Sequence, residues 1–166
     1  MKISVKTQEL LEHLQTLARV ASARSAIQAL AGVEIDATDK AIELRATDQE
    51  LSLRVPLQGN VAQPGTVVLP ARLLLDVVRQ LPGDTVSLEY RGKEQDVEIV
   101  CGTAQFHLRT LRAEDFPSLP EPAGSEAVSL PAAEFVETIR SFSPSAETRT
   151  PVRIGRVSSR DAARAT

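Results

Sequence analysis

Asp48 and Glu50 are the acidic residues whose spacing comes nearest to that of a catalytic pair. Carboxylates two positions apart on a strand point to the same side, as a general acid and a general base must. A turn between two strands explains the same residues, because an Asp in a turn accepts backbone hydrogen bonds. We favour the turn. A small hydrolase using both carboxylates is the alternative, and a pH–rate profile on generic substrates would test it.

The other reactive residue types are few and scattered. His13, His107 and Cys101 are too few for a structural zinc site. The chain also has no glycine-rich phosphate loop and no G-x-S-x-G motif. Cys101 alternates with Val97 and Ile99, which indicates a small core residue, and His13 beside an apolar helical stripe is expected to be solvated. The sequence therefore predicts neither an enzyme nor a cofactor.

Composition and charge set the broad class of the protein. Apolar residues make up 42% and charged residues 25% of the 166 residues, as in an ordinary globular chain. The net charge of −3 argues against a protein that coats nucleic acid with a basic surface, but it leaves room for a local basic face. One cysteine and an amphipathic N-terminus without a long apolar run predict a cytoplasmic protein.

A repeat organises the elements that would position any site. Three segments, offset by 64 and 61 residues, combine a short strand, a break and a helix with one apolar stripe. We expect Pro70 and Pro131 at first helical positions and Thr7 in the N-cap region of the first helix. The matching stripe positions are Leu10, Leu74 and Phe135; Leu11, Leu75 and Val136; Leu14, Val78 and Ile139; and Leu17, Leu81 and Phe142.

Between the helices the apolar residues alternate with polar ones, which predicts strands with one buried face. The predicted fold is α+β, with two strand–helix–three-strand units, antiparallel sheets and two helices on one face. Hairpin turns are expected at Asp39-Lys40, Arg91-Gly92-Lys93 and Cys101-Gly102-Thr103. The expected boundaries are a domain over 1–120, a Pro-rich linker over 121–126, an incomplete unit over 127–149 and a disordered tail over 150–166.

Several segments together resemble the bacterial DNA polymerase III beta subunit, a sliding clamp, from Met1 to about Arg149. They include LRATDQELSLRVP, VVLPARLLLDVVRQLPG, FHLRTLRAEDFPSLP, SLPAAEF and AETR. The resemblance implies a DNA-clamp fold in which helices line the hole of a head-to-tail homodimeric ring and sheets form its rim. It also implies a processivity factor without covalent chemistry, whose partners are duplex DNA, the replicative polymerase and an ATP-driven clamp loader.

The same resemblance suggests site residues. Arg24 matches a loop arginine that touches DNA, and Arg72 and Arg79 match basic positions on a lining helix. A solvated helix face, with Arg72 paired to Asp76, is the alternative for the last two.

Phe106 and Leu108 match apolar residues on the edge strand that meets the partner subunit, although their alternation also suits a core strand. Arg149 matches a residue of the pocket that binds partner peptides, and the other members of that pocket are missing.

The chain departs from the family pattern in places. Ser25 and Gln28 stand where the family often has prolines, and Thr103 and Gln105 replace basic residues found in some members. After Arg149 the sequence leaves the pattern, so a gene truncation or frame change near Thr150 is a hypothesis that the nucleotide sequence would test. Ring closure is not expected for this chain. The alternative function is a stand-alone domain that caps or blocks an intact clamp.

Overall fold

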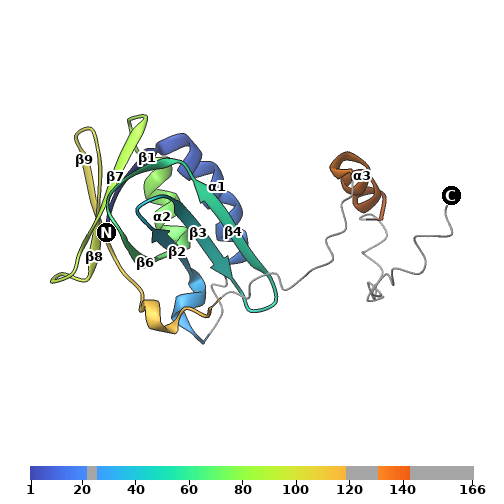
Figure 1. Ribbon diagram of the computed structural model, residues 1–166, viewed down its shortest axis with the longest axis horizontal. Coiled ribbons are helices and arrows are strands. Elements are labelled where there is room, and N and C mark those ends of the chain that lie inside the picture. The colour runs from blue at the N-terminus through green and yellow to red at the C-terminus, as the bar shows by residue number, and fades with distance from the viewer. Residues whose placement is uncertain (22–25, 119–130, 143–166) are drawn as a thin grey trace. The chain divides into compact units, whose positions relative to one another are not determined.

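The structure is a computed structural model that describes residues 1–21, 26–118 and 131–142. It divides into two units, Met1–Glu121 and Pro122–Thr166, and each is treated separately. The first unit contains two antiparallel sheets and two α-helices (Figure 1). The predicted α+β class and the antiparallel sheets are therefore confirmed.

The four-stranded sheet has the order β4-β3-β2-β6, with every neighbouring pair antiparallel. Its strands are β2 (Gly32–Ala37), β3 (Ile42–Thr47), β4 (Ser52–Leu57) and β6 (Gly65–Pro70). The five-stranded sheet has the order β5-β1-β7-β8-β9. Its strands are β1 (Lys2–Lys6), β5 (Gly59–Gln63), β7 (Thr85–Arg91), β8 (Asp96–Cys101) and β9 (Ala104–Arg109). The three predicted hairpin turns join β2 to β3, β7 to β8 and β8 to β9.

The two strand–helix–three-strand units exchange their first strands. β1 pairs with β7 of the second unit, and β6 pairs with β2 of the first. β5 was not predicted, because Val61 is the one large apolar residue in Gly59–Gln63 and gives no alternating pattern. Gly59 allows β5 to approach β1, since a Cβ at this position would lie 2.7 Å from the backbone oxygen of Ser4.

The two predicted helical stripes are buried except at Leu11 and Leu81, which are partly buried, and Leu81 lies beyond the end of the second helix. α1 (Thr7–Val20) buries Leu10, Leu14 and Leu17, and α2 (Ala71–Arg79) buries Leu74 and Val78. The helices pack against each other, and both contact the sheets.

The predicted helix starts at Pro70 and Pro131 were wrong by one residue. Pro70 is the N-cap of α2 and the last residue of β6, because its pairing with Gly32 extends the strand to the helix. Thr7, expected in the N-cap region, is the first residue of α1, and its N–H donates to the carbonyl of Asp84 over 2.9 Å. Pro131 likewise precedes its helix, and its carbonyl accepts the N–H of Phe135.

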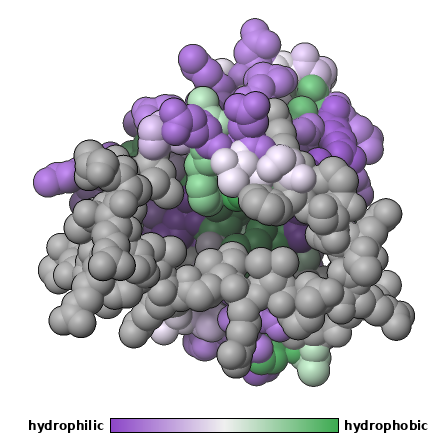
Figure 2. Space-filling model, turned by 90° about the vertical axis from the view of Figure 1, so that its right-hand side faces the viewer, coloured by the Kyte–Doolittle hydropathy of each residue, from purple (hydrophilic) through white to green (hydrophobic). Residues whose placement is uncertain are grey.

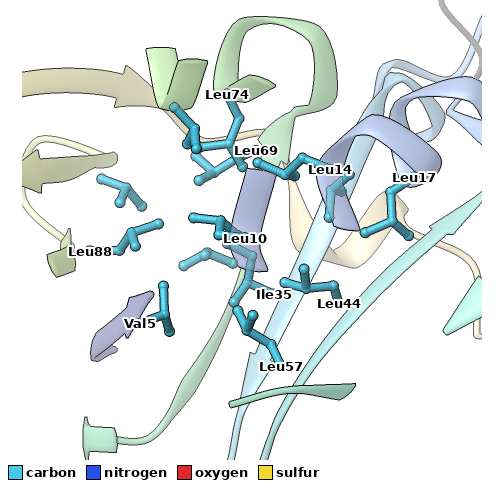
Figure 3. Close-up of a cluster of buried hydrophobic side chains, with 14 of the residues drawn as sticks. Val5, Leu10, Leu14, Leu17, Ile35, Leu44, Leu57, Leu69, Leu74 and Leu88 are labelled. Carbon is cyan, nitrogen blue, oxygen red and sulfur yellow. The ribbon is translucent and has the colours of Figure 1, made fainter. Parts of the chain in front are cut away.

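One apolar core joins both helices and both sheets. Figure 3 shows Leu10, Leu14 and Leu17 of α1 pointing into the cluster that side chains of the strands and of α2 complete. Because every element of this cluster buries aliphatic side chains against the others, hydrophobic burial holds the two sheets and two helices together.

A smaller cluster forms outside the four-stranded sheet. After β9, residues 110–116, here called the crossing segment, run to the edge of β6 and include the short helix η2 (Ala113–Asp115). Phe116 of this segment packs with Val68 and with Ala29 of the short helix η1 (Gln28–Ala31). The crossing segment therefore covers part of one sheet with residues that follow the last strand of the other.

The second unit is described over the helix α3 (Ala132–Phe142). Phe135, Val136 and Ile139 of its predicted stripe are exposed. The helix lies where the third repeat places one. The predicted linker and tail lie outside the described residues, so the predicted boundaries within 121–166 stay predictions.

Candidate nucleic-acid interface

Exposed polar residues recur at equivalent positions on α1 and α2. With the 64-residue offset of the repeat, Gln8 corresponds to Arg72, Glu12 to Asp76 and Gln15 to Arg79. The spacing i, i+4, i+7 places each set on one side of its helix, away from the buried stripe. We call these six residues and Arg19, which extends the α1 row by four positions, the polar stripe. All seven members are exposed.

Two contacts order side chains within the polar stripe. The Nε2 of Gln8 donates to Oε1 of Glu12 over 2.9 Å, and Nη1 of Arg79 lies 3.6 Å from Oδ1 of Asp76. The alternative interpretation of the sequence paired Asp76 with Arg72, and the structure pairs it with Arg79 instead. An exposed pair of this kind contributes about 0–1 kcal/mol, so Arg79 is readily available to another anion.

The charge of the polar stripe is weakly positive, with three arginines against two carboxylates. In the view of Figure 2, hydrophilic residues cover most of the visible described surface and smaller hydrophobic areas show between them. Arginines on such a surface can contact phosphates without reading sequence. Arg24, the predicted loop contact, lies outside the described residues, as does Arg149.

The second predicted surface is the free edge of β9, which pairs only with β8 among the described strands. Phe106 is half-buried and Leu108 is buried, and both pack on the main core. The N–H of Thr110 donates to the carbonyl of Gln95, so these two residues form a hydrogen-bonded pair. Because such pairs occur at every second residue of an antiparallel ladder, the backbone groups of Leu108 and Phe106 also bond to β8.

The free backbone groups of this edge therefore belong to Gln105, His107 and Arg109, which sequence reasoning missed. These residues could have been predicted from the two-residue turn at Gly102-Thr103, because the length of a hairpin loop determines which residues of the two strands pair. The free edge of β4, on the other sheet, offers fewer donors than the β9 edge. The same alternation directs the backbone nitrogen of Pro56 away from β3, and a proline nitrogen carries no N–H.

A row of charged side chains fixes the solvent face beside the β9 edge. Arg91 donates to both carboxylate oxygens of Asp96, over 2.8 and 2.7 Å, and its guanidinium lies 2.9 Å from Nδ1 of His107. The hydrogen bond from Arg91 is the main reason that the pKa of Asp96 is lowered. Glu98 lies 3.8 Å from Nε2 of the same histidine. These contacts connect β7, β8 and β9 across the sheet.

The acidic pair considered as a catalytic site forms a turn between β3 and β4. Oδ1 of Asp48 accepts the N–H groups of Glu50 and Leu51 over 3.0 and 2.7 Å, and these bonds, chiefly that of Leu51, lower the pKa of Asp48. The turn interpretation is confirmed. Cys101 is buried in the core, also as predicted.

Known proteins share this arrangement of two sheets and two helices. A family model described as the DNA polymerase III beta subunit, N-terminal domain, matches residues 1–120. The chain belongs to this family. The beta sliding clamp of Streptomyces coelicolor is 36% identical over 121 residues, and that of Pseudomonas aeruginosa is 35% identical over 127 residues. These matches cover 73% and 75% of this chain.

Solved sliding clamps have the same fold. The crystal structure of the DNA polymerase sliding clamp from Bacillus subtilis matches with a TM-score of 0.78 and 30% identity over 84% of this chain. That of the DNA polymerase III subunit beta from Pseudomonas aeruginosa gives 0.74 and 31% over the same share. The predicted clamp fold is thus confirmed.

This chain covers only part of the length of its relatives. It spans about a third of the length of the curated relatives, 32% and 34% for the two clamps above, and 39% and 38% of the two solved chains. No described helix is long and apolar enough to cross a membrane.

Proposed function

We propose that this chain supplies the N-terminal domain of a sliding clamp, a DNA polymerase processivity factor that surrounds duplex DNA and performs no covalent chemistry. The observation that carries the proposal is the polar stripe: two repeat-related helices pack together and expose equivalent polar rows, while both sheets are joined to their buried sides. A surface of this kind suits a duplex that must be held near the protein and still move along it.

Weak phosphate contacts explain how such a surface permits sliding. Arg72 and Arg79 lie seven residues apart on one face of α2, and their guanidinium groups would contact phosphates through solvent-exposed, salt-sensitive bonds. Arg24, carried over from the family resemblance, would add a loop contact. Because no base edge is read, every position along the duplex has similar energy.

A titration with a short mixed-sequence duplex at low ionic strength, followed by backbone NMR of the full chain, tests the DNA contact. We expect shifts concentrated on the exposed sides of α1 and α2. Replacing Arg24, Arg72 or Arg79 by Ala should weaken binding, and each lost phosphate contact should reduce the log–log salt slope by about 0.9.

Lys40→Ala is the matched control, since Lys40 is an exposed cation in the β2–β3 turn. An equal loss of affinity in Lys40→Ala and Arg72→Ala would contradict a helix-face contact, and an unchanged affinity in Arg24→Ala would remove Arg24 from the site.

The β9 edge supports the proposed subunit contact. Its outward backbone groups at Gln105, His107 and Arg109 offer the pairing that an added strand requires, and Phe106 and Leu108 back this edge with apolar side chains. In a complete ring we propose that a partner subunit pairs here. The polymerase and the clamp loader are the further partners that we propose for the whole subunit, with Arg149 in the peptide pocket.

The same open edge favours a second candidate function, a domain that caps or blocks an intact clamp. Mixing this chain with the full-length Pseudomonas aeruginosa clamp and measuring the complex by light scattering tests it. Gln105→Pro removes an outward N–H and breaks no backbone hydrogen bond to β8, although it also removes the hydrogen bond from the Gln105 side chain to Glu98, and it should abolish capture. Ser52→Pro is the control: on the β4 edge it likewise removes an outward N–H together with one side-chain hydrogen bond, to Thr47, and it should leave capture intact. A chain that stays monomeric with and without the clamp would exclude the capping function.

A further inference from the structure

A carboxylate occupies the middle of the polar stripe on both helices. Glu12 and Asp76 are repeat-equivalent, each four positions after the first stripe residue and three before the third on its helix. The third repeat continues the pattern, since Glu137 of α3 follows Asp76 by the 61-residue offset. A surface selected only for phosphate affinity would not place an acid at the centre of each polar row.

Both carboxylates engage the stripe residues that would otherwise be free for a phosphate. Glu12 accepts the amide of Gln8 over 2.9 Å, and Asp76 lies 3.6 Å from the guanidinium of Arg79. The side chains of Asp76 and Arg79 are 62% and 52% exposed, so water screens their attraction and the pair has little structural value. A duplex phosphate would therefore displace Asp76 from Arg79 at little cost in free energy.

We propose that Glu12 and Asp76 set the DNA affinity of the helix face, keeping each phosphate contact weak enough for the duplex to move. The inference rests on the proposed function and deepens it. Glu12 repels the passing phosphates directly. Asp76 repels them as well and in addition offers Arg79 an intramolecular anion whenever a phosphate leaves. When a phosphate leaves, Asp76 takes its place beside Arg79, so the guanidinium is not left without an anionic partner.

The duplex titration described above tests this inference with charge-neutral variants. Asp76→Asn and Glu12→Gln should each tighten binding about 2- to 5-fold at low salt, the range expected from removing one exposed charge interaction. The double variant should show the product of the two factors. The gain should vanish near 1 M salt, where the screening length falls to about 3 Å. Asp76→Asn should also steepen the salt slope by up to about 0.9, because Arg79 becomes free to neutralise a phosphate.

Asp39→Asn separates a local effect from a change in net charge. Asp39 is an exposed acid in the β2–β3 turn, and its replacement alters the total charge by the same amount. If Asp39→Asn tightens binding as much as Asp76→Asn, or if Asp76→Asn has no effect, the inference is overturned while the proposed DNA contact stands. If the duplex shifts no residue of α1 or α2 in the unmodified chain, the proposed function and this inference both fail.

Discussion

The N–H of Leu111 donates to the carbonyl of Val68 over 2.8 Å and joins the end of the five-stranded sheet to the edge of the four-stranded one. Val68 is fully buried although it lies on the outer side of its sheet, because Phe116 and Ala29 cover it. Gly32 fits beneath this contact, where a Cβ would lie 2.5 Å from Cγ1 of Val68. The crossing segment is thus part of the folded domain.

Removing the ring of Phe116 should show how much the crossing segment stabilises the domain. Phe116→Ala deletes a buried ring and leaves a cavity over Val68, so we expect the free energy of unfolding to fall by about 3 kcal/mol. Urea denaturation measures it. Leu51→Ala, at an exposed turn position, should change it by less than about 0.5 kcal/mol. A similar small change in Phe116→Ala would mean that the segment is detached in solution.

Adjacent leucines on α2 offer a test of the buried stripe. Leu74 is fully buried and Leu73 is 56% exposed, although both belong to the same helix turn. We expect Leu74→Ala to cost about 2–5 kcal/mol of stability and Leu73→Ala less than about 1 kcal/mol, measured by thermal and urea unfolding. Equal losses would show that the helix is rotated from its described orientation.

The turn at Asp48 should make stability depend on pH. Backbone N–H groups of Leu51 and Glu50 lower the folded-state pKa of Asp48 from its ordinary value of 3.8. This stabilisation is complete above the unfolded pKa and is lost as pH falls from there through the lower folded pKa. Asp48→Asn keeps an acceptor oxygen without the charge. Its stability deficit relative to the native chain should therefore shrink on acidification, as measured by urea unfolding from pH 6 to pH 2. A deficit that is constant with pH would contradict the assignment.

Gly59 and Gly92 should respond oppositely to substitution by alanine. A Cβ at position 59 would meet Cγ1 of Val5 at 2.6 Å and a backbone oxygen at 2.7 Å, so β5 would have to move from β1. We expect Gly59→Ala to lower the free energy of unfolding by about 1–3 kcal/mol. At position 92 the nearest atom lies 3.8 Å away, and Ala there should be neutral or stabilise the fold by up to about 1 kcal/mol. Destabilisation by Gly92→Ala equal to that of Gly59→Ala would refute the close approach.

Local periodicity predicted the elements better than it predicted their partners. The stripes of α1 and α2 and most strands follow from spacings of 3.6 and 2 residues, which hydrophobic burial imposes directly. The pairing of β1 with β7 brings together residues 79 to 87 positions apart, from Lys6 with Thr85 to Lys2 with Glu89, and no local pattern encodes such a contact. β5 was not predicted, because its sequence contains Gly59 and one large apolar residue, Val61, and lacks the alternation that indicates a strand.

Side-chain direction explains why the predicted partner of Asp76 was wrong. Cβ atoms lean toward the N-terminus of a helix, so Arg79 leans back over Asp76, whereas Arg72 leans away from it.

Predicting the free backbone groups of β9 required the register of the β8–β9 hairpin, which the alternation of apolar residues alone does not determine. The clamp resemblance supplied Arg24, Arg72 and Arg79 as DNA contacts, and these roles stay predictions.

The strand exchange between the two units has a consequence for biosynthesis. During synthesis β1 can pair with β5 first, and it joins the rest of the five-stranded sheet only after the ribosome has released β7. Residues 1–58 therefore leave the exit tunnel with one sheet lacking its β6 and with β1 unpaired. Two peptides cut near Gln58 would each carry a strand that only the other peptide can use. The domain is therefore a natural candidate for split-protein complementation, with each fragment acting as the template on which the other completes its fold.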